Sequence, residues 1–204
     1  MIKIQYFGLA SFILDFHMDF QQMLAARLHG LREQQGWSLE QLAERSGVSR
    51  SNISNIERGQ SSPTAVVLDK LATALGVPLA SLFTHEPEES VSPCRRVEDQ
   101  PVWTDPQSGY QRRHLTALPQ APLQMVEVRF PAGQSVQYAP QPLPTHWHQQ
   151  IWLLEGEMQI ESSEGEWQLR AGDCLCMSIE GGTRFMNPGS TPARYLVALV
   201  RSTN

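Results

Sequence analysis

The sequence predicts a multidomain protein in which an all-α domain of five helices is followed by an all-β barrel. Apolar residues recur at helical spacing from Phe20 onward, and short apolar runs separated by Gly, Pro, Asn and Ser fill the second half. Between them lies HEPEESVSP, residues 85–93, which is acidic and has no apolar periodicity. We divide the chain into an N-terminal extension (1–17), a helical domain (18–84), a linker (85–98) and a barrel domain (99–204).

Composition and charge limit the functions that the 204 residues can carry. A hydrophobic content of 41% supplies packed cores, and a net charge of −5 argues against coating nucleic acid through bulk charge. The three cysteines, Cys94, Cys174 and Cys176, are odd in number and lack zinc-finger spacing, which favours reduced thiols. We therefore expect a cytoplasmic protein whose nucleic-acid binding, if present, depends on a motif.

Residues 1–17 are apolar and raise the question of a targeting signal. The run from Phe7 to Leu14 is too short to span a bilayer, Asp15 follows it, and no A-x-A cleavage site is present. We favour translation starting at Met18, directly before the first helix, so the extension is not native. We expect no membrane association.

Each predicted helix has a start or stop signal. Phe20, Leu24, Leu28 and Leu31 form one apolar stripe on the first helix, which ends at Gly36. Ser38 and Gln41 have the spacing of a capping box for the second helix, which ends at Gly47.

The last three helices follow the same rules. Ser49 can cap the third helix, whose Ile53 and Ile56 face inward, and Gly59 ends it. Ser62 and Pro63 open the fourth, because proline fits a first helical turn. The inner stripe of the fourth helix is Val67, Leu71 and Leu75, and residues 78–83 form a short fifth helix.

Residues 38–58, SLEQLAERSGVSRSNISNIER, resemble the helix-turn-helix of the phage-repressor and Cro-like (XRE) family, and the resemblance extends over roughly residues 20–83. Ala43 is small where two helices cross, and Gly47 allows the turn. Arg32 and Glu57 match a pair that forms a salt bridge between the first and third helices in that family. The resemblance implies a sequence-specific transcriptional regulator that places its third helix in the DNA major groove.

The resemblance also assigns contacts with double-stranded DNA. Residues near the start of the third helix are expected to reach base edges, and residues at helix ends to reach phosphates. The base-reading residues are Arg50, Ser51, Asn52 and Asn55, and the phosphate-binding residues are Ser38 and Arg58. Residues 19–85 contain as many acidic as basic residues, so one copy binds DNA weakly through charge, and we expect a homodimer on a two-half-site operator.

The second half contains seven predicted strands, at 125–130, 151–156, 157–162, 166–170, 173–178, 183–187 and 193–200. The segments IWLLEGEMQI, EWQLRAGD and TRFMNPG resemble the cupin family, a jelly-roll barrel, over roughly residues 120–200. A helix-turn-helix followed by a cupin resembles bacterial regulators in which the barrel senses a small molecule. The expected pocket residues, from the register, are Gln149, Ile151, Thr183 and Phe185.

The His-x-His of His146 and His148 raises the question of a metal site. Metal-binding cupins have a carboxylate seven residues before the glycine that matches Gly156, where this chain has Gln149, and a second-motif histidine where it has Thr183. Because two of four ligands are missing, we expect no metal, no cofactor and no enzyme activity. The alternative is a metal-dependent cupin enzyme, of dioxygenase or isomerase type, with an autoregulatory DNA-binding domain.

Aromatic residues of the barrel have two explanations. Trp152, Trp167 and Tyr195 can line a pocket, but packing in the barrel or in a dimer interface is the simpler explanation.

Overall fold

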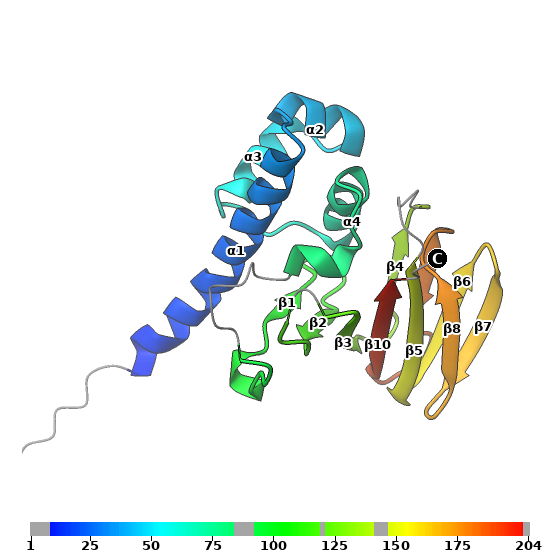
Figure 1. Ribbon diagram of the computed structural model, residues 1–204. Helices are drawn as coiled ribbons and strands as arrows, with labels where there is room; N and C mark the ends of the chain where they lie inside the picture. The colour runs from blue at the N-terminus through cyan, green and yellow to red at the C-terminus, as the bar shows by residue number, and fades with distance from the viewer. Residues whose placement is uncertain (1–8, 84–91, 119–120, 141–146, 202–204) are drawn as a thin grey trace, which may run out of the picture.

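The structure is a computed structural model that describes residues 9–83, 92–118, 121–140 and 147–201 (Figure 1). The described part contains four α-helices and two 3₁₀-helices: α1 (Leu9–Gln34), α2 (Leu39–Ser46), α3 (Arg50–Glu57), α4 (Ala65–Ala74), η1 (Leu79–Phe83) and η2 (Val97–Asp99). The prediction of five α-helices is wrong, because η1 is a 3₁₀-helix. Its five residues follow Pro78, whose carbonyl accepts a short-range bond from the Ser81 amide (2.8 Å).

The caps of α2 and α3 are confirmed. The Ser38 amide donates to Gln41 Oε1 (2.8 Å) and the Gln41 amide donates to Ser38 Oγ (3.2 Å), which completes the capping box. Ser49 Oγ accepts from the Asn52 amide (3.3 Å). Gly47, between α2 and α3, has φ of 66°, a left-handed conformation that glycine adopts without a steric penalty.

Two helical boundaries differ from the prediction. α1 begins at Leu9, well before the first residue of the predicted stripe. α4 begins after Thr64, whose Oγ1 accepts from the Val67 amide (3.3 Å), and not at Ser62-Pro63. Its fully buried residues include Leu68 and Leu71, while Val67 is only partly buried.

Ten strands make two sheets: β1 (Val102–Thr104), β2 (Gln111–His114), β3 (Leu123–Phe130), β4 (Ser135–Tyr138), β5 (Trp147–Glu155), β6 (Glu157–Ser162), β7 (Gly165–Arg170), β8 (Cys174–Ser178), β9 (Thr183–Met186) and β10 (Ala193–Arg201). One sheet has the order β1-β2-β3-β10-β5-β8 and the other β4-β9-β6-β7. The seven predicted strands are present, whereas β1, β2 and β4 were not predicted. The two antiparallel sheets enclose a common core, as the jelly-roll resemblance implies.

Gly156 turns the chain from β5 to β6 against β10. Its φ is 79°, and an added Cβ would lie 2.9 Å from the Ala193 Cα. A larger residue there would push the turn between β5 and β6 away from the start of β10. Glycine therefore stands at this turn for a steric reason.

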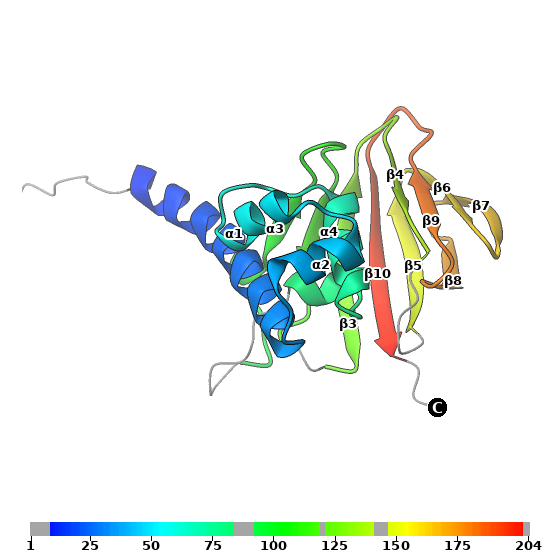
Figure 2. The same ribbon diagram turned by 90° about the horizontal axis from the view of Figure 1, so that it is seen from above.

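The helical domain and the barrel pack directly against each other, with the helices on the side of β1, β2 and β3 (Figures 1 and 2). Phe83 of η1 stacks on His114 of β2, with ring centroids 4.6 Å apart, and lies 5.7 Å from the Trp103 ring of β1. Buried residues of both domains form one continuous hydrophobic core. None of the helices in the described ranges is long and apolar enough to cross a membrane.

Candidate nucleic-acid interface and junction pocket

The helix α3 lies at the end of the helical domain remote from the barrel (Figure 1). Ile53 and Ile56 are buried on its inner face, as predicted. Its opposite face carries Arg50 and Ser51, which are exposed. The helix is therefore held by an apolar face and presents a polar one.

A buried ion pair fixes α3 against α1. Arg32 Nε donates to Glu57 Oε1 (2.8 Å) and Nη2 donates to Oε2 (2.9 Å). Arg32 Nη1 also donates to the Trp37 carbonyl (2.7 Å). Burial opposes ionisation of Glu57, but hydrogen bonds from Arg32 and His29 outweigh it and hold the pKa of that carboxyl below its ordinary value. The predicted salt bridge between the first and third helices is confirmed.

The outward side chains of α3 are paired with neighbours that DNA could replace. Arg50 Nε lies 2.8 Å from Glu40 Oε1 of α2, and both side chains are mostly exposed. Arg58 Nη2 donates to Asn55 Oδ1 (2.7 Å). Asn52 is partly buried beside the cap of α3. Because exposed ion pairs are weak, their exchange for phosphate or base contacts has a low free-energy cost.

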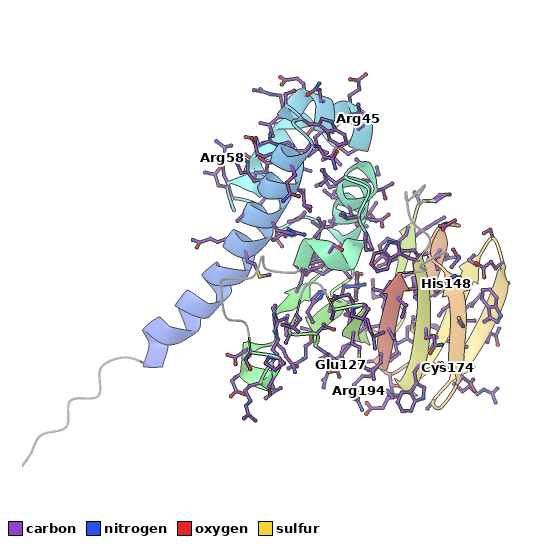
Figure 3. All side chains as sticks on the ribbon, viewed as in Figure 1. Arg45, Arg58, Glu127, His148, Cys174 and Arg194 are labelled. Carbon is purple, nitrogen blue, oxygen red and sulfur yellow. The ribbon has the colours of Figure 1, made fainter. Side chains whose placement is uncertain are left out.

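Further polar groups lie at the same end of the molecule. Ser38 is exposed at the start of α2, where helix amides favour an anion. Arg45 lies over the Trp37 ring, with its guanidinium carbon 4.4 Å from the ring centroid. Figure 3 shows Arg45 and Arg58 projecting from this end, away from the strands. The sequence analysis did not include Arg45 among the DNA-binding candidates. A basic residue in the last turn of α2, just before the turn at Gly47, could have indicated a phosphate contact.

A second candidate site is a pocket at the junction between the domains, which we call the junction pocket. It encloses about 80 Å³, and its walls come from α4 and η1 on one side and from the inner faces of both sheets on the other. Gln149, Thr183 and Phe185 line it, while Ile151 is buried in the core and is not a lining residue. The helical domain supplies Asp69 and Pro78 through Ala80.

The junction pocket contains opposite charges from the two domains. Arg112 projects from β2, and its Nε atom is buried without a hydrogen-bond partner among the described residues. Asp69 of α4 is 3% exposed. Burial raises the pKa of Asp69 to about 7, and the positive charge of Arg112 opposes this increase.

Three tyrosines line the junction pocket together with Arg112. The hydroxyls of Tyr110 and Tyr138 are 2.6 Å apart, and Tyr110 is hydrogen-bonded to Arg112. Burial raises the pKa of Tyr110, Tyr138 and Tyr195. All three are therefore neutral phenols at physiological pH. One hydroxyl of the Tyr110–Tyr138 pair donates to the other, which leaves two of the three O–H groups as donors.

His148, the described histidine of the His-x-His, is not a lining residue of this pocket. His148 is exposed on the outer face of β5, while its neighbour Gln149 points inward. His146 lies outside the described residues. Within the described ranges, no group of three or more His, Cys, Asp or Glu is placed to hold a metal ion. Cys94, Cys174 and Cys176 are free and exposed.

Sequence reasoning missed Arg112, Asp69 and two of the tyrosines. Asp69 follows Leu68 in AVVLDKLATAL, and a carboxylate within so apolar a helix was a usable signal. Arg112 lies in QRRH, which has no apolar alternation and was not recognised as a strand.

Comparison with known proteins identifies relatives of both domains together. The helix-turn-helix family HTH_3 matches residues 21–82. The chain is 32% identical over 182 residues to the HTH-type transcriptional regulator SutR of Escherichia coli (strain K12), covering 87% of this chain and 94% of that protein. It is 27% identical over 182 residues to the HTH-type transcriptional regulator PuuR of the same strain, with the same coverage.

A solved structure shows the same arrangement of elements. A crystal structure of an HTH_3 family transcriptional regulator from Vibrio cholerae superposes with a TM-score of 0.70 at 22% identity. The superposition covers 91% of this chain and 99% of that chain, so it includes the helical domain and the barrel.

Proposed function

This chain belongs to the HTH-type transcriptional regulators, and we propose that it binds a pseudo-palindromic operator as a homodimer while a small effector in the junction pocket alters that binding. The observation that carries the proposal is the position of α3. Its apolar face is buried, and its polar face is exposed at the end of the molecule remote from the barrel. This placement leaves α3 free to enter a major groove.

The proposed DNA contacts follow from side-chain chemistry. Arg50 can donate two hydrogen bonds to guanine, and Asn52 and Asn55 can pair with adenine, while Ser51 discriminates less. Ser38 and Arg58 bind phosphates on either side of the groove. We place the protein in the cytoplasm, where its operator would be.

The direct test is DNA binding by purified protein, using a duplex recovered from bound genomic fragments. Fluorescence anisotropy should show affinity that falls steeply with salt, by about 0.9 log unit per log unit of salt for each phosphate neutralised. Arg50→Ala should reduce discrimination against base substitutions by about 1–3 kcal/mol at one position in each half-site. The matched control is Arg170→Ala, which removes an exposed arginine from the barrel. An unchanged base preference in Arg50→Ala would remove Arg50 from base reading.

For the homodimer we propose contact through the outer face of the larger sheet. Three of the six exposed large hydrophobic residues in the described ranges lie there: Leu123, Trp152 and Val200. Val200 is paired with Leu123 across β10 and β3, and Leu196 is paired with Trp152 across β10 and β5. An apolar patch of this kind, bordered by the Arg194–Glu155 ion pair, suits a two-fold interface.

Sedimentation velocity tests the dimer. Val200→Glu should give a folded monomer, because it places charge within the patch, directly beside Leu123. Val97→Glu, at an exposed position of η2, is the matched control. A dimer that persists in Val200→Glu would move the interface elsewhere.

We do not propose the metal-dependent enzyme. His148 lies on the sheet face opposite the junction pocket, and Gln149 and Thr183 occupy pocket positions where metal-binding cupins have ligands. A neutral amide and a hydroxyl are weak ligands for a transition metal.

A further inference from the structure

The junction pocket is built from both domains, so its chemistry can be read for the class of molecule that it holds. We propose that it binds a small carboxylate with an apolar body, with the carboxylate oxygens on the Arg112 guanidinium. This inference rests on the proposed function, because it names the class of the effector. It uses residues that the sequence analysis did not select.

The first step is the charge of the pocket. The guanidinium of Arg112 stays protonated at all accessible pH values, and its Nε has no hydrogen-bond partner among the described residues. A buried cation with an unused donor is costly unless an anion pairs with it. A carboxylate matches the planar fork of arginine with two parallel hydrogen bonds.

The second step is the counter-charge that the protein already supplies. Among the described lining residues, the one acidic side chain is Asp69. Burial raises the pKa of Asp69 to about 7, so near neutral pH only part of the population carries its negative charge. Wherever Asp69 is protonated, the positive charge of Arg112 is uncompensated within the pocket, and a ligand anion can neutralise it.

The third step is hydrogen bonding. Tyr110, Tyr138 and Tyr195 are kept neutral by burial and line the pocket together with Arg112. Neutral hydroxyls donate to a carboxylate without adding negative charge. The site is thus rich in donors, as an anion requires.

The fourth step is shape. Apolar lining from Phe185, Val197 and Leu199 lies opposite the polar groups and favours a hydrocarbon body. A volume of about 80 Å³ corresponds to roughly six water-sized positions, so it suits an acid of about six non-hydrogen atoms. Isobutyrate has this size, and isobutyramide is its neutral isostere.

The fifth step connects the ligand with the DNA-binding domain. A carboxylate on Arg112 lies close to Asp69 of α4, and two like charges in one pocket favour protonation of Asp69. The other titratable groups lining the pocket are Arg112 and the three tyrosines, and none of these changes charge near neutral pH. Binding should therefore weaken as pH rises through about 7, because Asp69 then ionises.

Isothermal titration calorimetry on the full-length protein tests the inference without DNA. Isobutyrate should bind saturably, and isobutyramide should bind at least about tenfold more weakly, because a charge-assisted pair is lost. Arg112→Gln should weaken isobutyrate binding to a similar degree, and Arg112→Lys should weaken it less, because it keeps the charge. Arg113→Gln, on the same strand, should leave it unchanged.

Asp69→Asn provides the second readout. In the wild type, isobutyrate should bind at least about threefold more weakly at about pH 8 than at about pH 6, and this difference should vanish in Asp69→Asn. Thermal unfolding of each variant shows whether it is folded. Equal binding of isobutyramide, unchanged binding in folded Arg112→Gln, or no saturable isobutyrate binding at either pH would overturn the inference. Loss of DNA binding would overturn the proposed function alone, since the calorimetry contains no DNA.

Discussion

Charged side chains are exposed at one end of the helical domain and buried at the other. At the end that carries α3, Arg50 is paired with Glu40 at the surface, where water can replace either partner. At the barrel-facing end, Asp69 and Arg112 are enclosed between the domains, and the pKa of Asp69 is raised to about 7. The first arrangement suits rapid exchange of partners, and the second makes the charge state depend on what occupies the pocket.

The largest change in the free energy of unfolding is expected from a substitution that weakens packing between the two domains. Phe83→Ala removes a buried ring that contacts Trp103 and His114, and should lower the free energy of unfolding by about 3–5 kcal/mol. Urea unfolding, followed by tryptophan fluorescence and by circular dichroism, measures the loss. Phe83→Leu keeps apolar volume and should lose about 1.5 kcal/mol or less. Equal stabilities for the wild type and Phe83→Ala would contradict a packed junction.

The next effect concerns the pH dependence of stability. The folded-state pKa of Asp69 is raised from 3.8 to about 7, so the folded protein binds a proton that the unfolded chain has released. Stability from this group is complete below about pH 4 and falls by at most about 1.4 kcal/mol per pH unit up to about pH 7. Unfolding at a series of pH values should show this slope, and Asp69→Asn should reduce it. An identical profile in Asp69→Asn would show that burial does not raise the pKa of Asp69 in the folded protein.

A smaller effect is expected at the start of α4. Asp105 Oδ1 accepts from the Ala65 amide (2.8 Å) and Oδ2 from the Ser108 amide (2.8 Å), so the barrel caps a helix of the other domain. Asp105→Ala should cost about 1–2 kcal/mol, since it removes a cap and leaves a buried donor unpaired. Asp105→Asn keeps one acceptor oxygen and should cost less. Chemical denaturation distinguishes the two, and an equal cost would argue against the capping role.

The smallest change in stability is expected at the end that carries α3. Glu40→Ala breaks an exposed pair and should alter the free energy of unfolding by less than about 1 kcal/mol. It should strengthen DNA binding, because Arg50 is released and a negative charge is removed. Glu44→Ala removes the same charge from α2 without touching Arg50. An equal gain in both variants, measured by anisotropy, would assign the effect to bulk charge alone.

The sequence predicts the end that carries α3 far better than the junction, and the reason is physical. Caps, stripes and the Arg32–Glu57 pair depend on residues within one domain, and their spacing is dictated by helical geometry. The junction depends on β1 and β2, whose short polar strands have no alternation to detect. Arg112 is buried by Asp69 and by neighbouring strands that are distant in sequence, so no local pattern marks it.

The pocket residues predicted from the register show the same limit. Gln149, Thr183 and Phe185 line the junction pocket because strand alternation places them inside the barrel. Strand alternation predicts which face of the sheet a side chain occupies, but not whether it lies at the pocket or further inside the barrel. Ile151 is buried in the core and does not reach the pocket. The wall contributed by α4 follows from domain packing, which periodicity does not encode.

The bond from Ala65 to Asp105 bears on how such regulators can be recombined. Its donor is a main-chain amide, so any residue except proline at position 65 could supply it. A helix-turn-helix domain from another protein, joined to this barrel, would therefore need no particular amino acid at position 65. It would need a helix that starts at the same place relative to Asp105. The boundary of an exchangeable domain accordingly falls at Asp105, between β1 and β2, several residues beyond the linker. The hydrogen bond constrains where the helix must start and does not constrain which residue stands there.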